Sequence, residues 1–381
     1  MKKNYGIIRK VRLLKHVWCL CGAIFMYKGV DAQDLNFTQF YELPLLRNPA
    51  LAGVFNGDVR VQTVFRNQWQ SVTVPYRTMG ASAEVVFPLD DYGEALTIGV
   101  QLLHDVAGDA KLKRTHVLPV IAYRRPVFEN TLITGAFMGG MVSSSFDQAA
   151  IRWGDQYRNG VYNPTNSTQQ VLQKTAFTYL DLGAGISISS VLADGVAGYG
   201  GVGLFHFNKP KVAFNNDDIK LGKKWSFNAG LTVNTSDYSR LNFYGDYLLQ
   251  QAATSASGAE MVGELNVLMA GVFYTYDFGH YDVDKPMSFS MGAIYRMNDA
   301  IAPMVRLDLK NFAIGMSYDA NVSQLSIASG ARGGFEITFA YLANLNARWQ
   351  YTQHPSGCNV GFRGRDIIRG QERKMRKRFR I

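Results

Sequence analysis

The sequence predicts an all-β protein, a transmembrane antiparallel β-barrel of about 14 strands in the outer membrane. Three observations lead to this fold class. Apolar residues alternate with small or polar residues from about residue 58 onward, as in strands with one apolar face. The alternating segments are about 10–15 residues long, whereas soluble strands average nearer 5–6, so a membrane barrel is favoured over a soluble sandwich. A short export signal precedes these segments.

The composition agrees with this fold class. Hydrophobic residues make up 47% of the 381 residues and charged residues 18%, with 37 Gly, 20 Tyr and 23 Phe. A disordered chain is excluded, because disorder needs few aromatics and a high charge density. The mean hydropathy of -0.08 also argues against several apolar helices of about 20 residues.

The net charge of +10 comes from 40 Lys+Arg against 30 Asp+Glu, and it belongs to the two ends of the chain. Residues 1–32 hold seven basic residues and one acid, and the segment from Arg363 to the end holds nine basic residues and two acids. The body between them has 24 basic and 27 acidic residues and is slightly acidic. We therefore expect no nucleic-acid partner.

Residues 1–32 are predicted to form a signal peptide. Six basic residues precede an apolar stretch over residues 17–27, which is too short to span a bilayer. Residues 30–32 offer small residues at the outer positions of a cleavage site, so Gln33 is expected to begin the mature chain. A short cytosolic helix or anchor is the alternative. Cleavage would leave Cys358 as the one thiol, which excludes an intramolecular disulfide and a cysteine-based metal site.

Residues 33–57 are predicted to be either a periplasmic lead-in or a plug folded into the barrel lumen. The stretch from Asn36 to Gly53 is apolar, but Pro44 and Pro49 prevent a regular helix or a central strand there. The sequence leaves both alternatives open.

Residues 58–345 are predicted to form the barrel. Phe335 and Ile337 share one face of a segment and Glu336 lies on the other, a pattern that recurs along the chain. Charged residues on the small or polar face suit a wet lumen. These residues are Arg60, Arg66, Asp246, Arg296, Asp319 and Glu336. The expected strands are 58–69, 77–88, 93–107, 112–126, 130–145, 176–190, 196–207, 224–235, 239–251, 259–277, 286–297, 300–310, 311–321 and 333–345.

The even strand count predicts that the N- and C-termini are both periplasmic. The longest connection, about 146–175, follows the fifth strand and is expected on the extracellular side. Residues 346–381 are predicted to form a basic periplasmic tail. It is interpreted either as a docking element for an acidic protein, lipoprotein or peptidoglycan, or as a solvated tail. The residues of the docking interpretation are Arg373, Lys374, Arg376, Lys377 and Arg378.

One glycine-rich stretch has the spacing of a dinucleotide-binding turn. Gly198 to Gly203 matches G-x-G-x-x-G, but such a turn needs a parallel βαβ unit and a helix at its end. Leu204 and Phe205 continue a strand instead. We interpret these glycines as barrel positions where side chains would crowd.

No other motif predicts a catalytic, cofactor-binding or metal site. His104 and Asp105 form the most enzyme-like pair, but no nucleophile motif accompanies them. The acidic residues around 216–218 and 282–284 lack the spacing of a Ca²⁺ loop, so solvated loops are expected. The protein is therefore predicted not to be an enzyme and to need no cofactor.

Several motifs resemble the PorP/SprF proteins of the type IX secretion system. Residues 33–41 and the Asn-Pro-Ala-Leu-Ala-Gly run of residues 48–53 are similar to the mature start of that family. Residues 66–69 (Arg-Asn-Gln-Trp), 317–323 and 333–337 resemble later elements in the expected order. The family often closes with Cys-Pro-x-Phe, which is absent here. The motif residues are Asn48, Pro49, Ala50, Gly53, Arg66, Gln68, Trp69, Tyr318, Asp319, Asn321 and Ser323.

The resemblance implies a non-enzymatic outer-membrane barrel that assists export or surface attachment of type IX cargo proteins such as gliding adhesins. The implied partners are the C-terminal domains of the cargo, the translocon and periplasmic lipoprotein components, with outer-membrane lipid around the barrel. Two other hypotheses remain. One is a passive outer-membrane channel for a small solute, and the other is an outer-membrane hydrolase that uses His104 and Asp105.

Overall fold

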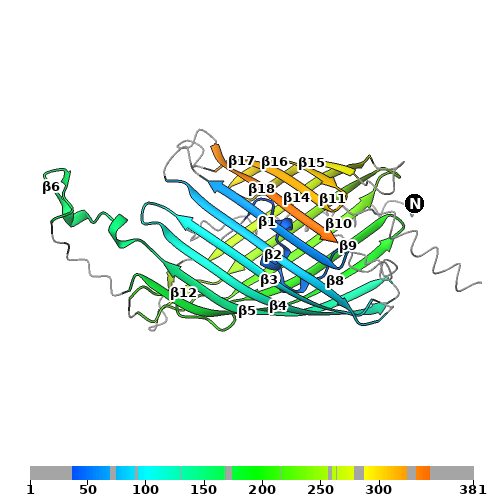
Figure 1. The fold of residues 1–381 in the computed structure, drawn as a ribbon, viewed down its shortest axis with the longest axis horizontal. Coiled ribbons are helices and arrows are strands. Elements are labelled where there is room, and N and C mark those ends of the chain that lie inside the picture. The colour runs from blue at the N-terminus through cyan, green and yellow to red at the C-terminus, as the bar shows by residue number, and fades with distance from the viewer. Residues whose placement is uncertain are drawn as a thin grey trace, which may run out of the picture.

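The alternating segments form a closed barrel of fourteen antiparallel strands (Figure 1). This computed structural model describes residues 37–68, 74–90, 93–128, 130–166, 168, 174–215, 217–255, 260–262, 264–278, 287–323 and 332–343. The barrel strands are β1 (Val59–Gln68), β2 (Tyr76–Pro88), β3 (Ala95–Ala107), β4 (Leu112–Phe128), β5 (Thr131–Ser145), β8 (Ala176–Ala193), β9 (Val196–Phe205), β10 (Lys224–Asn234), β11 (Ser239–Gln250), β14 (Leu265–Asp277), β15 (Met287–Arg296), β16 (Ala300–Leu309), β17 (Phe312–Asn321) and β18 (Arg332–Ala343).

The predicted alternation is confirmed along the strands. In β16, for example, Val305 faces outward and is 45% exposed, whereas Arg306 and Asp308 face inward and are buried. Adjacent residues of a strand point to opposite faces, so the apolar set faces outward and the small or polar set faces the lumen. This is the arrangement of a barrel whose outer surface contacts lipid.

The predicted strand over residues 259–277 is wrong at its beginning. The barrel strand β14 starts at Leu265, and β13 (Glu260–Val262) instead pairs with β12 (Ala253–Thr254) in a separate two-stranded sheet. The register between β12 and β13 is irregular. A single alternating run in the sequence does not reveal with which strand each half of the run pairs.

The barrel closes where its first strand meets its last. β1 pairs with β18 over ten residues, from Val59 opposite Ala343 to Gln68 opposite Gly334. We call this β1–β18 contact the seam. Among the described strands, every other neighbouring pair in the barrel follows in chain order, so the seam is the one contact that joins the two ends of the strand series.

Connections of different length leave the two ends of the barrel. The three longest, 146–175, 206–223 and 251–264, lie at one end, called the long-loop end here. The opposite, short-turn end carries two-residue turns such as 194–195 and 310–311, and β1 begins and β18 ends there. The longest connections are therefore gathered at one end, as in bacterial membrane barrels.

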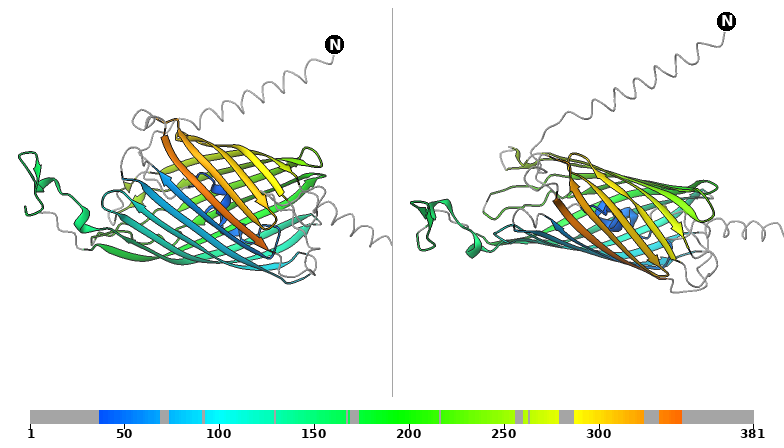
Figure 2. Two further views of the ribbon diagram at one scale, coloured as in Figure 1. Left: turned by 45° about the horizontal axis from the view of Figure 1, so that its top comes forward. Right: turned by 90° about the horizontal axis from the view of Figure 1, so that it is seen from above.

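The longest connection has structure of its own. It contains η3 (Gln148–Ala150), η4 (Gly154–Gln156) and a hairpin of β6 (Tyr157–Arg158) and β7 (Val161–Tyr162) that projects from the barrel in Figures 1 and 2. Asn159 and Gly160 form the hairpin turn with φ angles of 53° and 78°. Two consecutive positive φ values suit the right-handed twist of a two-residue hairpin, and Asn-Gly tolerates them best.

Among the described residues, no helix is long and apolar enough to cross a membrane.

A candidate functional site inside the barrel

Residues 37–55, called the plug here, lie inside the barrel (dark blue in Figure 2). The plug consists of three short helical turns, η1 (Phe40–Glu42), α2 (Pro44–Arg47) and η2 (Pro49–Leu51). Pro44 and Pro49 each occupy the first position of a turn, where the missing N–H costs nothing. The same prolines cannot continue a preceding helix, so the segment breaks into turns that fold back on themselves.

The plug is as buried as a protein core. Leu45, Ala50, Leu51 and Phe55 have no exposed surface, and nearly all other plug side chains are buried. Tyr41 stacks on Tyr244 of the barrel wall with ring centroids 5.2 Å apart. The lumen around this segment is therefore packed rather than wet, which corrects the expectation drawn from its charged residues.

The plug runs from the long-loop half of the lumen to the short-turn end. Thr38 bonds to Arg66 and Asp319, which lie near the long-loop ends of β1 and β17. Gly53 lies against Thr97 near the short-turn end of β3 and has a φ of +71°. A Cβ on Gly53 would come within 2.1 Å of the Thr97 hydroxyl, so glycine is required by both its conformation and its contact.

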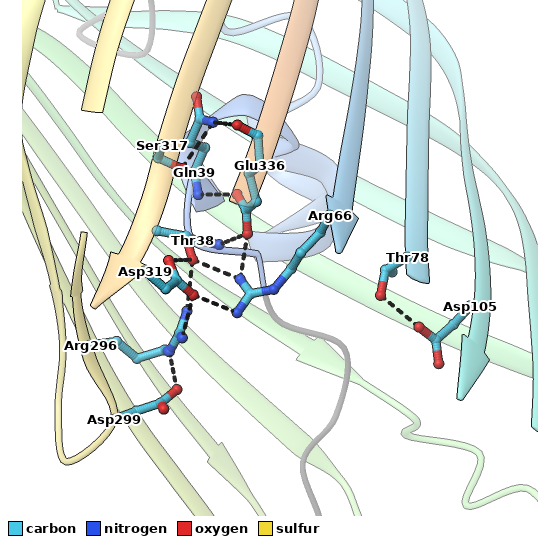
Figure 3. Close-up of polar contacts among 10 residues, drawn as sticks. All are labelled: Thr38, Gln39, Arg66, Thr78, Asp105, Arg296, Asp299, Ser317, Asp319 and Glu336. Carbon is cyan, nitrogen blue, oxygen red and sulfur yellow. Dashed lines mark hydrogen bonds and ion pairs between the residues drawn. The ribbon is translucent and has the colours of Figure 1, made fainter. Parts of the chain in front are cut away.

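An ion-pair cluster holds the first residues of the plug (Figure 3). The Arg66 guanidinium pairs with Glu336 and, at 2.8 Å, with Asp319. Asp319 also accepts from Arg296 at 2.9 Å, and the Thr38 hydroxyl donates to Asp319 at 2.7 Å. The Thr38 hydroxyl in turn accepts from both arginines. Four charged residues from four strands thus converge on one plug threonine.

The backbone of the plug uses the same cluster. The Gln39 N–H donates to Glu336 at 2.8 Å, and the Thr38 N–H donates to the other oxygen of that carboxylate. The Gln39 side chain donates to Ser317 and accepts from Thr338 at 3.0 Å. Main-chain donors at the start of the plug are therefore satisfied by the barrel wall, as buried donors must be.

Two further ion pairs fix the middle of the plug. Arg47 makes two bonds of 2.6 and 2.5 Å to the Asp246 carboxylate on β11. Glu42 pairs with Arg306, which also bonds to Asp308 at 2.9 Å. All five groups are buried, and each charge faces an opposite one. The two parallel bonds between Arg47 and Asp246 fix the orientation of the guanidinium as well as attracting it.

A third set holds the end of the plug. Glu84 on β2 accepts from the Gly53 N–H at 2.9 Å and from Arg60 at 2.7 Å. Arg60 also donates to the Leu51 carbonyl, and Arg124 donates to the Gly53 carbonyl at 2.7 Å. The free main-chain groups after the last helical turn are thereby paired with side chains of three strands.

Complete buried ion pairs are nearly neutral for stability, but removing one partner costs about 3–5 kcal/mol. The plug carries two charged residues, Glu42 and Arg47, and each of them pairs with an opposite charge on the wall. We therefore expect these pairs to fix where the plug lies, because a displaced plug would leave the Asp246 carboxylate buried without its Arg47 partner.

Glycines in the wall make room for the plug. Asn48 lies against Gly185, Gly201 and Gly203, where added Cβ atoms would meet its atoms at 1.9, 2.7 and 3.2 Å. Asn48 needs this space because its side chain accepts from the Ala50 N–H at 2.9 Å and donates to a wall carbonyl. Gly201 and Gly203 lie within the G-x-G-x-x-G stretch and face the plug, whereas Gly198 and Gly200 face neighbouring strands.

We expect Gly185→Ala to destabilise the folded barrel by about 1–3 kcal/mol, because the new methyl group would displace Asn48 in a packed site. Gly135→Ala is the matched control, since nothing lies within 4 Å of a Cβ at that position. Urea unfolding of the detergent-solubilised proteins, followed by tryptophan fluorescence, measures both. Equal stability of the two variants would contradict the packing described here.

The plug leaves little free space beside it. A cavity lined by Phe37, Arg47, Asp181 and His206 among others has an empty volume of about 650 Å³, part of it open solvent. Only about 50 Å³ of it can take the centre of a water molecule, which is room for a few waters. This cavity is too small to be a solute path.

The structure brings most of the family-motif residues to the plug and its wall contacts. Asn48 caps η2, Pro49 begins it, and the Ala50 carbonyl accepts from Ser187 at 2.7 Å. Gln68 ends β1 opposite Gly334 in the seam. The residues in or against the plug are Asn48, Pro49, Ala50, Gly53, Arg66 and Asp319.

Other motif residues lie apart from the plug. Tyr318 faces outward and is 47% exposed, whereas Asn321 is buried at the end of β17. The Ser323 N–H donates to the Asp299 carbonyl in a turn of the long-loop end. Trp69 and the tail residues Arg373, Lys374, Arg376, Lys377 and Arg378 lie outside the described residues.

The enzyme-like pair does not come together. His104 and Asp105 are neighbours on β3 and therefore point to opposite faces of the wall. His104 is exposed on the outer face beside Thr115, at 2.9 Å, and Asp105 accepts from Thr78 at 2.6 Å. Within the described part of the chain, no three His, Cys, Asp or Glu side chains are grouped as metal ligands. Asn216, Asp282 and Asp284 lie outside that part.

Sequence reasoning missed the charged residues on the plug itself. Glu42 and Arg47 are embedded in an apolar stretch, and their partners Arg306 and Asp246 are distant in the sequence. The signal in the sequence that could have indicated these pairs is that residues 37–55 and the lumen face of the strands carry opposite charges. A second missed feature is the buried pair of His206 and Asp181, 2.7 Å apart.

The comparison with known families decides the identity of the barrel. The family described as "Type IX secretion system membrane protein PorP/SprF" matches residues 29–341, which include the plug and nearly all of the strands. The chain belongs to the PorP/SprF family. The predicted resemblance is thereby confirmed. For this PorP/SprF protein, no curated protein matches in sequence.

The PorP/SprF barrel is also similar to solved structures at low identity. The Pseudomonas putida toluene transporter TodX has 10% identity, covers 80% of this chain and 94% of its own, and gives a TM-score of 0.47. The Ralstonia pickettii toluene transporter TbuX has 10% identity, 79% and 92% coverage, and a TM-score of 0.44. BamA from Haemophilus ducreyi has 9% identity, 75% and 70% coverage, and a TM-score of 0.37.

Proposed function

We propose that this protein is a non-enzymatic outer-membrane component of the type IX secretion system that assists export or surface attachment of cargo proteins. Family membership is the observation that carries the proposal. The proposed partners are the C-terminal domains of the cargo, the translocon and periplasmic lipoprotein components. Gliding adhesins are the cargo that the family resemblance indicates.

The filled lumen favours an accessory role in secretion and argues against passage of cargo through this barrel. A folded or unfolded polypeptide crossing this barrel would have to displace residues 37–55, which are buried and are joined to the wall by the Glu42–Arg306 and Arg47–Asp246 ion pairs. Displacement would leave the Asp246 carboxylate buried without its ion-pair partner, at a cost of about 3–5 kcal/mol. We therefore propose that cargo contacts lie outside the lumen, and that another component supplies the path across the membrane.

The proposed orientation has the short-turn end facing the periplasm. In bacterial barrels the short turns are periplasmic and the long loops extracellular. The start of β1 at Val59 and the end of β18 at Ala343 would then both be periplasmic. The long-loop end, including the β6–β7 hairpin, would be available to cargo at the cell surface. The termini themselves, with the signal peptide and basic tail, lie outside the described residues.

The function is tested by deleting the gene and measuring which proteins with type IX C-terminal domains reach the medium and the cell surface. We expect a subset of cargo to be lost from the surface and to return when the natural gene is supplied. Gly135→Ala should restore it as well. If every such cargo is secreted and displayed normally in the deletion strain, the proposed function is wrong.

The passive-channel hypothesis requires an unobstructed lumen, and the packed plug opposes it. The hydrolase hypothesis requires a His–Asp pair on one face, and His104 and Asp105 lie on opposite faces. A His104→Ala strain is expected to keep the lipolytic and proteolytic profiles of its parent.

A further inference from the structure

We propose that the plug also has a function in assembly: it acts as an internal template that joins the two edges of the strand series, so that the barrel closes at the β1–β18 seam. This goes beyond the role in secretion, since it concerns how the protein reaches its folded state. Two separate parts of the plug, one at each end, carry the inference.

The seam is the contact that is hardest to form. The other barrel strands pair with their neighbours in chain order and can add one after another as antiparallel pairs, whereas β1 must find β18 at the far end of the strand series. The entropic cost of closing a loop rises with its length, so this contact costs more than any hairpin. Pairings between distant segments are also the slow ones in folding.

The first residues of the plug bridge the seam at its long-loop end. On one side, Arg66 of β1 donates to the Thr38 hydroxyl at 2.7 Å. On the other side, Glu336 of β18 accepts from the backbone N–H groups of Thr38 and Gln39, and Asp319 of β17 accepts from the Thr38 hydroxyl. The two plug residues thus contact both edges at once, and Figure 3 shows the side chains of Arg66, Asp319 and Glu336 gathered around them.

The last residues of the plug bridge the seam at its short-turn end. Phe55 packs in one apolar cluster with Val86 and Ala95 of β2 and β3, and with Ala340 and Leu342 of β18. The Arg60 guanidinium of β1 lies 4.3 Å from the centroid of the Phe55 ring. Arg60 and Gly53 also share the Glu84 carboxylate of β2. Both ends of the plug therefore hold β1 and β18 in register.

Near the seam, a glycine in the wall also allows a plug side chain to approach closely. Gly315 of β17 leaves room for the Gln39 side chain, since a Cβ there would come within 2.6 Å of the Gln39 amide oxygen. The Gln39 amide bonds to Ser317 on β17 and to Thr338 on β18. Gln39 thereby ties the last two strands of the barrel to the segment that precedes the first.

The middle of the plug provides a matched comparison. Arg47 pairs with Asp246 on β11, which is separated from the seam by several strands on either side. This contact is also a buried plug–wall bond, but it joins the plug to a strand that already has chain neighbours on both sides. If the plug acts as a closure template, loss of the Arg47 contact should affect the stability of the closed barrel and leave the rate of closure nearly unchanged.

The test compares a seam variant with a control variant in refolding into detergent micelles or vesicles. The seam variant is Thr38→Val with Gln39→Leu, which removes plug groups and leaves both strands intact. The control is Arg47→Met with Asp246→Asn, which removes one buried plug–wall pair away from the seam without leaving a buried charge. A closed barrel in an unheated sample migrates faster on a gel than the heated, unfolded chain. The growth of the faster band with time gives the rate of closure.

We expect the seam variant to close at least several-fold more slowly than the natural chain, and the control to close at nearly its rate but unfold faster. Equal slowing of both variants, or slowing of neither, would overturn the template role. If the seam variant yields no closed band, Thr38→Ser and Thr38→Val are compared. The serine variant keeps the hydroxyl and should close normally, and the valine variant should be slow; equal rates for these two would also overturn the proposal. The refolding test is made without cargo, so its outcome is independent of the secretion test of the proposed function.

Discussion

Replacing Arg66 by alanine is expected to lower the free energy of unfolding by about 3–5 kcal/mol, one of the largest effects of any single substitution in this barrel. The change removes the positive charge between Glu336 and Asp319, both of which are buried with almost no exposed surface. Asp319 would keep its pair with Arg296, but Glu336 would lose the guanidinium with which it pairs. Chemical unfolding of the purified barrel in detergent, monitored by fluorescence and by gel mobility, measures this change.

Arg125→Ala is the control for Arg66→Ala, because Arg125 lies on the exposed face of β4. An exposed substitution of this kind is expected to change the free energy of unfolding by about 0.5 kcal/mol or less. If Arg66→Ala is as mild as Arg125→Ala, the ion-pair cluster around Thr38 does not hold the plug.

The second large effect is expected in conductance. Residues 44–50 form α2 and the start of η2, and they fill the lumen between the two ends of the plug. We replace them by a Gly/Ser linker of equal length and add Asp246→Asn, so that no buried carboxylate is left without its partner. Planar-bilayer recordings should show discrete conductance steps for this variant, because a barrel of this size without side chains in its centre holds water.

The natural chain should give no steady conductance under the same conditions. Arg47→Met with Asp246→Asn is the control, since it removes the same ion pair without leaving a buried charge and keeps the other side chains that fill the lumen. A steady conductance in the natural chain would instead support the passive-channel hypothesis, and a silent linker variant would mean that other residues close the lumen.

The barrel itself was predictable from the sequence because its alternation has a physical cause. One face of each strand contacts lipid and the other faces the lumen, so neighbouring residues such as Val305 and Arg306 must differ in polarity. The pattern fails at residues 259–277, where two short pairings share one alternating run. Pairing partners depend on contacts between distant segments, and a local pattern carries no information about them.

The plug could be predicted only as one of two alternatives. Pro44 and Pro49 exclude regular structure, but they do not say whether the segment lies inside the barrel or below it. That choice depends on pairs such as Arg47 with Asp246, whose members are 199 residues apart in the chain. The lumen-facing position of Asp246 was visible in the sequence, but its partner was not.

The central claim is that residues 37–55 are sealed inside the barrel, and cysteine labelling tests it most directly. Leu45→Cys is made in a chain in which Cys19, Cys21 and Cys358 are replaced by serine, since Leu45 has no exposed surface and cysteine fits its space. Val161→Cys, at a position 67% exposed on the long-loop hairpin, is the reference. In the folded barrel, a water-soluble maleimide should label Val161→Cys rapidly and leave Leu45→Cys unlabelled until the protein is unfolded. Equal labelling of the two cysteines in the folded barrel would contradict the account.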